Sequence, residues 1–166
     1  MVTLRFYNSI KRLEVWRGSD VSSIAADSVV RNELNGWRPN PDKDPKNEVV
    51  YGITQNPYPR QPVMPREIPE GRWQVYTPVE REDEYLEPYY IPTSAEQWLE
   101  VWKLDENGGY EQGTGGKVLD TGYGLHFSQS NTTVGCIKIH RRGDLLWLRE
   151  VICQELDLDH KVWLEV

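Results

Sequence analysis

The sequence predicts a mainly β fold with a few helices, formed as one domain over residues 1–166. Apolar and polar residues alternate in several short runs, as at Val2, Leu4 and Phe6. The chain contains seven Trp and nine Tyr but only two Phe. Because aromatic residues favour strands, this content also indicates a β-rich fold. A chain of 166 residues and 19.4 kDa has the size of a single domain with one core.

The first part of the chain is expected to hold short strands and a long loop. Residues 2–6 and 13–15 alternate and predict two strands joined by a turn. Residues 20–35 fit helical and strand spacing equally, so both interpretations stay open. Residues 37–69 are rich in Pro, Asn and Asp, which favours a long loop with a possible strand at 49–53.

The middle of the chain is predicted to contain a strand, a second long loop and a helix. Residues 72–76 alternate as a strand does, and residues 77–93 are acidic, Tyr-rich and expected to be a loop. Ser94 is a suitable helix cap, Gln97 follows three residues later as in a capping box, and residues 98–102 supply an apolar stripe.

The last part is predicted to hold three strands and a second helix. Residues 118–120 form a short strand, residues 136–140 alternate around two Ile, and residues 161–166 close the chain as a strand. Asp144 is expected to cap a helix whose apolar residues recur over 145–152.

Composition excludes several classes of function. The net charge is −7, with 26 acidic against 19 basic residues, so no broad basic groove for nucleic acid is expected. No apolar stretch is long enough to span a membrane, and residues 1–6 do not have the layout of a signal peptide. Two cysteines form at most one disulfide. No metal-ligand spacing or phosphate loop occurs, so neither a metal nor a cofactor is expected. Oligomeric state stays open.

The segment 122–140 carries the residues suited to chemistry. A thiol attacks a carbonyl as its thiolate, and a free Cys has a pKa near 8.5, so it needs a base or a positive charge nearby. Two of the three His, His126 and His140, lie within ten residues of Cys136. Cys153 lies on the second predicted helix, where a buried structural thiol is expected.

His126 is the preferred base for Cys136, and His140 is the secondary candidate. On one strand, Cys136 and His140 would stand about 13 Å apart, beyond the reach of a nucleophile–base pair. The turn-rich residues 128–133 follow His126 and can fold back as a hairpin that brings it beside Cys136. The alternative is that the two are chance neighbours in a hairpin.

Two further residues near the thiol suggest roles in binding. Gly135 lacks a Cβ, which permits a positive φ or a close approach of substrate, and the amides around Cys136 could then face an oxyanion. Lys138 lies two residues after Cys136 on the same face of the predicted strand. It could stabilise the thiolate or bind a substrate carboxylate.

Three features of the chain together resemble the signature of the YkuD-type L,D-transpeptidases. They are His126, the run Thr133-x-Gly135-Cys136-Ile137-Lys138, and the predicted helix that begins at Asp144. Residues 69–73 are similar to an upstream element of that family, and residues 13–18 to its first hairpin. The chain departs from the pattern at Val134, at Lys138 and in its ten-residue His-to-Cys interval, which fits an outlying, phage- or effector-type branch.

The resemblance implies a β-sandwich or barrel-like fold and a peptidoglycan stem peptide as substrate. Cys136 would attack the L,D bond, His126 would hold the proton with its ring oriented by a backbone carbonyl, and a thioester would form. Amides at Gly135 and Cys136 would bind the oxyanion, and Thr133, in the matching motif, would belong to the same oxyanion- or substrate-binding group. Tyr123 and Trp73 are expected either to line the groove or to fill the core.

Transpeptidation and carboxypeptidation stay equally open, because an amine or water can accept the acyl group. A peptidoglycan enzyme must reach the cell envelope, so residence there or delivery to it is expected. Two alternatives remain: a non-catalytic binding module of the same fold, with the acidic segment 82–90 as a partner surface, or a cysteine peptidase acting on other peptides.

Overall fold

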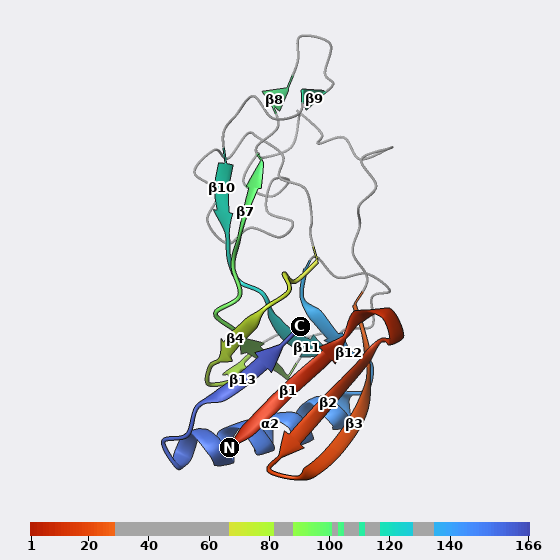
Figure 1. Ribbon diagram of the computed structural model, residues 1–166, viewed down its shortest axis with the longest axis vertical. Coiled ribbons are helices and arrows are strands. Elements are labelled where there is room, and N and C mark those ends of the chain that lie inside the picture. The colour runs from red at the N-terminus through yellow and green to blue at the C-terminus, as the bar shows by residue number, and fades with distance from the viewer. Residues whose placement is uncertain (29–66, 82–87, 101–102, 105–109, 112–116, 128–134) are drawn as a thin grey trace.

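A curled nine-stranded sheet, shaped as a half-barrel, is the framework of the protein (Figure 1). The computed structural model describes residues 1–28, 67–81, 88–100, 103–104, 110–111, 117–127 and 135–166. Within them, one α-helix and two small two-stranded ribbons accompany the sheet. The prediction of a mainly β fold is therefore confirmed.

The large sheet has the strand order β4-β13-β1-β2-β3-β12-β11-β6-β5, and the ribbons pair β7 with β10 and β8 with β9. The strands are β1 Val2–Tyr7, β2 Arg12–Arg17, β3 Asp20–Asp27, β4 Arg72–Val75, β5 Val79–Glu80, β6 Tyr89–Pro92, β7 Gln97–Glu100, β8 Lys103–Leu104, β9 Tyr110–Glu111, β10 Lys117–Asp120, β11 Gly124–Phe127, β12 Ile137–Ile139 and β13 Val162–Glu165. The helices are the 3-10 turn η1 Asn8–Ile10 and α2 Arg142–Asp157.

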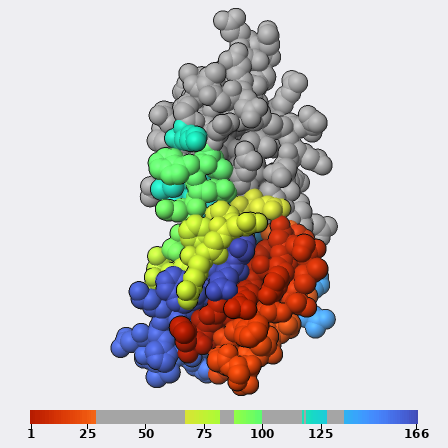
Figure 2. All heavy atoms as spheres, in the orientation of Figure 1, coloured from red at the N-terminus to blue at the C-terminus, as the bar shows by residue number. Residues whose placement is uncertain are grey.

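Alternation of apolar residues decides which face of the sheet is buried. In β1, Val2, Leu4 and Phe6 are buried while the residues between them are more exposed. Leu13 and Val15 do the same in the neighbouring strand β2. Figure 2 shows the opposite face of β1, β2, β4 and β13, where these strands lie side by side.

The helix α2 covers the apolar face of the sheet. It lies across the sheet behind β1 and β2 in Figure 1 and contacts β1, β6, β11, β12 and β13. Its buried residues recur every three or four positions and are Leu145, Leu148, Val151 and Ile152. The prediction of this helix is confirmed, but Arg141 is the N-cap, and Asp144 lies in the first turn, where its charge favours the helix dipole.

The predicted helix after Ser94 is wrong, because its residues form the strand β7. Trp98 is 65% exposed and the next residue, Leu99, is 4% exposed, so exposure alternates with the period of a strand. The Ser94 hydroxyl accepts a hydrogen bond from the backbone of Gln74 at 2.8 Å and caps no helix. Pairing with β10 overrides the local helical signals.

Other expectations were met in part. The open choice for residues 20–35 resolves to a strand through Asp27, and residues 29–35 lie outside the described residues. The expected loop at 77–93 contains the strands β5 and β6. The predicted strands at 2–6, 13–15, 72–76, 118–120, 136–140 and 161–166 correspond to β1, β2, β4, β10, β12 and β13. Most of the expected loop at 37–69 lies outside the described residues.

Among the helices that the structure describes, none is both long and apolar enough to cross a lipid bilayer.

Candidate active site

Two parallel strands place the candidate nucleophile and base on one face of the sheet. β11 and β12 pair with Leu125 opposite Ile137 and His126 opposite Lys138. Partners in a sheet share a face and residues alternate along a strand. His126, Lys138 and Cys136, which directly precedes β12, therefore share the face that points away from α2, while Leu125 and Ile137 are buried beneath.

The predicted hairpin between His126 and Cys136 is wrong, since the two strands run parallel. The connecting residues 128–134, which include Thr133, lie outside the described residues. In this register Cys136 lies one strand across from His126 and two residues along, which for an ideal parallel pair puts their Cα atoms about 8 Å apart. His140 is exposed just after β12, about 13 Å along the chain from Cys136.

The ring of His126 is oriented by a backbone carbonyl. Its Nδ1 lies 3.2 Å from the carbonyl oxygen of Phe127. A carbonyl only accepts, so Nδ1 carries the proton in the neutral ring and Nε2 presents its lone pair. This is the tautomer that a general base requires when Nε2 takes the proton.

The thiol of Cys136 is partly exposed and contacts the turn before β11. Its Sγ donates to the carbonyl oxygen of Gly122 at 3.8 Å, and the Tyr90 hydroxyl donates to the same oxygen. Gly135, immediately before the thiol, has a φ of +89°. The prediction that this glycine permits a positive φ is confirmed, and a side chain there would be strained.

Tyr90 is a site residue that sequence reasoning missed, because it fell in the expected loop at 77–93. It lies opposite His126 in the β6–β11 pair, and the Arg81 guanidinium lies 4.7 Å from its ring centroid. The ring covers Gly124, where an added Cβ would lie 2.5 Å from Tyr90 Cε2. Burial, and next the charge of Cys136, raise the pKa of Tyr90. The signal that could have found it is the alternation through Tyr90, Ile91 and Pro92.

Lys138 is buried on the face that carries Cys136, as its place in the strand predicts. It is 4% exposed, and its Nζ lies 3.6 Å from a carboxylate oxygen of Asp27, a residue of the neighbouring strand β3. The partner carboxylate offsets much of the cost of burying the ammonium group. A positive charge is thereby held beside His126 in the cross-strand register.

Tyr123, expected to line a groove or fill the core, is 2% exposed. Its hydroxyl donates to the carboxylate of Asp120 and accepts a hydrogen bond from Gln97 Nε2 at 2.5 Å. Burial raises the pKa of Asp120 to about 6, although hydrogen bonds from Tyr123 and the Thr121 backbone oppose this. Burial, followed by the hydrogen bond to Asp120, raises the pKa of Tyr123.

The remaining candidates lie elsewhere. Trp73 is half-buried and donates from Nε1 to the carbonyl oxygen of Pro69. Cys153 lies on α2 and is partly exposed, unlike the buried thiol that the sequence predicts, and neither cysteine forms a disulfide. In the described ranges, no three His, Cys, Asp or Glu residues gather as metal ligands.

A cavity of about 280 Å³ lies away from the thiol, between the end of β1 and the chain that enters β4. Its lining residues are Phe6, Asn8, Ser9, Glu67, Ile68, Glu70 and Val166. None of them belongs to the group around Cys136.

The chain matches no protein-family model, no curated protein and no solved structure.

Proposed function

We propose that the protein is a cysteine-dependent acyltransferase that acts on peptidoglycan stem peptides through a thioester on Cys136. The observation that supports it is the register of β11 and β12, which puts His126 and Cys136 on one face, one strand and two residues apart. The resemblance to the YkuD-type L,D-transpeptidases supplies the substrate class. The orientation of His126 by the Phe127 carbonyl supports its role as the base.

In the proposed mechanism, Nε2 of His126 takes the thiol proton of Cys136, and the sulfur attacks the carbonyl of the L,D bond. Backbone amides at Gly135 and Cys136 donate to the oxyanion. The tetrahedral intermediate collapses, D-Ala leaves with the proton from His126, and the acyl group stays on sulfur as a thioester. An acceptor amine then completes transpeptidation, whereas water completes carboxypeptidation.

Lys138 supplies the positive charge of the proposed site. It can stabilise the thiolate or bind a carboxylate of the donor peptide, and its ion pair with Asp27 holds it on the correct face. Tyr90 covers Gly124 beside the thiol and forms one wall of the site in this proposal.

Intact-mass measurement with a purified disaccharide-tetrapeptide tests the proposal. We expect a thioester adduct on Cys136 with release of D-Ala, and Cys136→Ala should abolish both while Cys153→Ala keeps them. His126→Ala should lower turnover on the order of 100-fold or more, and His140→Ala should have a much smaller effect.

Two outcomes would contradict the proposal. Turnover by Cys136→Ala would show that Cys136 is not the nucleophile. A larger loss of turnover in His140→Ala than in His126→Ala would show that His126 is not the base. An adduct with unrelated peptides but not with the muropeptide would instead assign a cysteine peptidase.

A further inference from the structure

The turn between β10 and β11 contains a buried acid that the proposed reaction does not use. Asp120 is 1% exposed, and its Oδ2 accepts the hydrogen bond from the Tyr123 hydroxyl. Its Oδ1 is buried, and no residue in the described part of the chain donates to it. A buried carboxylate that is incompletely hydrogen-bonded costs free energy, so its position needs an explanation.

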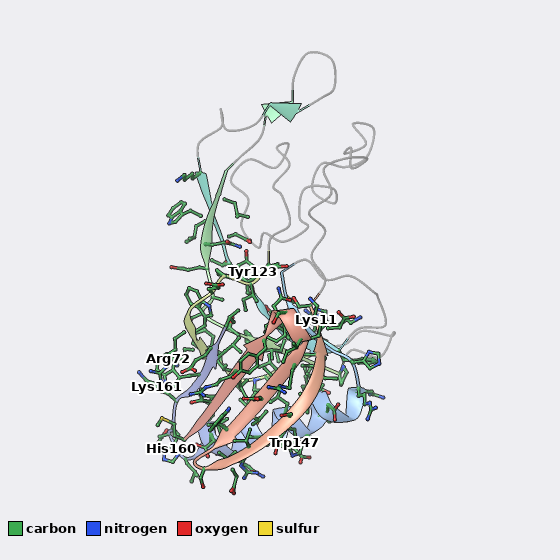
Figure 3. All side chains as sticks on the ribbon, turned by 45° about the vertical axis from the view of Figure 1, so that its right-hand side comes forward. Lys11, Arg72, Tyr123, Trp147, His160 and Lys161 are labelled. Carbon is green, nitrogen blue, oxygen red and sulfur yellow. The ribbon has the colours of Figure 1, made fainter. Side chains whose placement is uncertain are left out.

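The hydrogen bond between Tyr123 and Asp120 closes this turn at the point where the β7–β10 ribbon joins the large sheet. We call this bond, together with the one from Gln97 to the Tyr123 hydroxyl, the brace. Figure 3 shows Tyr123 at this junction, between the ribbon and the strands below it. Gln97, which lies opposite Asp120 in the ribbon, donates to the Tyr123 hydroxyl from the other side. The brace therefore joins the end of β10, the start of β11 and the neighbouring strand β7.

Gly122 lies inside the braced turn, and its carbonyl is the group that contacts the thiol. Its φ is +88°, a conformation that favours glycine. The carbonyl oxygen accepts from Cys136 Sγ at 3.8 Å and also from the Tyr90 hydroxyl. The turn between Asp120 and Tyr123 therefore carries the carbonyl that contacts the thiol.

We propose that the hydrogen bond which the Tyr123 hydroxyl donates to Asp120 positions Cys136: it fixes the turn 120–123, which holds the Gly122 carbonyl against the thiol. The inference deepens the proposed function and rests on it in taking Cys136 as the nucleophile. A carbonyl that accepts from S–H stabilises the protonated form. The turn keeps the thiol neutral and oriented until His126 takes its proton.

Alkylation of the full chain with iodoacetamide measures this effect directly. Mass spectrometry of the two cysteine peptides gives the rate at Cys136 across a range of pH, with Cys153 as an internal reference. Tyr123→Phe removes the hydroxyl and keeps the carboxyl group of Asp120. Asp120→Asn removes the charge and keeps an oxygen that accepts from Tyr123. Asp157→Asn, at an exposed position at the end of α2, is the matched control.

We expect Tyr123→Phe to lower the midpoint of the Cys136 alkylation profile by about half a pH unit, so that the rate at neutral pH rises about threefold. Asp120→Asn and Asp157→Asn should leave the midpoint in place. Among the described residues, the ionisable groups that couple to Cys136 or lie on its face are Tyr90, Tyr123, His126, Lys138, its partner Asp27, and His140 just after β12. Only Tyr123 is changed in Tyr123→Phe, and all of these groups remain in Asp120→Asn and Asp157→Asn.

Two results overturn the inference. One is an unchanged midpoint in Tyr123→Phe. The other is a shift in Asp120→Asn as large as that in Tyr123→Phe, because charge rather than the brace would then control the thiol. If Tyr123→Phe unfolds, both thiols react equally fast, and Asp120→Ala replaces it. That variant removes the acceptor of the Tyr123 hydroxyl, and absence of a shift there overturns the inference as well.

The readout separates this inference from the proposed function. A shift without any turnover of muropeptide contradicts the acyltransferase and leaves the positioning of the thiol supported. Turnover without a shift contradicts the positioning alone.

Discussion

Gly124 fixes the distance between the ring of Tyr90 and the strand β11. An added Cβ would lie 2.5 Å from the backbone oxygen of Ile91 and 2.5 Å from Tyr90 Cε2. The backbone oxygen cannot rotate away as a side chain can. We predict that Gly124→Ala lowers the free energy of unfolding by about 2–3 kcal/mol, as measured by urea denaturation.

Gly143 is the matched control for Gly124. It lies in the first turn of α2, and an added Cβ would meet nothing within 4 Å. Gly143→Ala should be neutral or stabilise by up to about 1 kcal/mol, because alanine favours the helix. Equal effects of the two substitutions would contradict the close packing of Tyr90 on Gly124.

Asp120 makes stability depend on pH. Burial raises its pKa from 3.8 to about 6. Because the folded-state pKa is the higher one, the contribution of this group to stability is complete below about pH 4 and is lost as the pH rises through about 6. We predict that Asp120→Asn removes this loss, so the variant gains on the order of 2–3 kcal/mol relative to the parent chain between about pH 4 and about pH 7.

Urea denaturation across this pH range measures the difference. Asp157→Asn is the control, because Asp157 is exposed and its substitution should leave the pH profile parallel to that of the parent chain. A constant difference between Asp120→Asn and the parent chain at all pH values would contradict the raised pKa.

At the scale of elements, α2 packs on the apolar face of the sheet and stabilises it. Leu148 is 0% exposed, whereas Leu146, two residues before it, is 36% exposed. We predict that Leu148→Ala lowers the free energy of unfolding by about 2–4 kcal/mol, since it leaves a cavity under the sheet. Leu146→Ala should cost less than about 1 kcal/mol. Denaturation followed by circular dichroism compares the two, and similar losses would place the helix differently on the sheet.

Elements with a complete local pattern could be predicted from the sequence, and elements held by distant partners could not. The alternation at Val2, Leu4 and Phe6 and the stripe of α2 depend only on local spacing, and both predictions are confirmed. Residues 97–100 have helical signals, yet pairing with β10 makes them a strand. Tyr90 was missed for the same reason, because its strand β6 is short and is stabilised by β11.

The site could be predicted in part. The pKa of a free thiol indicated that Cys136 needs a base nearby. The missing Cβ of Gly135 indicated that this residue permits a positive φ, which the structure has. The direction of β12 relative to β11 was predicted wrongly, since a turn-rich connection suits a hairpin and nothing local reports a parallel crossover. The hydrogen bond from Tyr123 to Asp120 depends on burial, which no spacing in the sequence reveals.

At the scale of the whole molecule, the large sheet joins segments far apart in the sequence. β13 lies between β4 and β1, with Leu164 opposite Leu4 and Trp73. The site stands on the same sheet at β12, and β1, β2 and β3 separate it from β13. If these strands unfold as one cooperative unit, a substitution that destabilises β13 must also lower the free energy of opening at β12.

Leu164→Ala tests this cooperativity. Leu164 is 0% exposed, so its truncation should cost about 3 kcal/mol and accelerate globally limited amide exchange roughly 100-fold. We predict the same acceleration in peptides that cover β12 and in those that cover β13, as measured by hydrogen exchange and mass spectrometry. Val21→Ala is the control, since Val21 is 45% exposed on β3 and its loss should change exchange little. Acceleration confined to β4, β13 and β1 would mean that the strands carrying Cys136 and His126 keep their geometry independently of the far edge of the sheet.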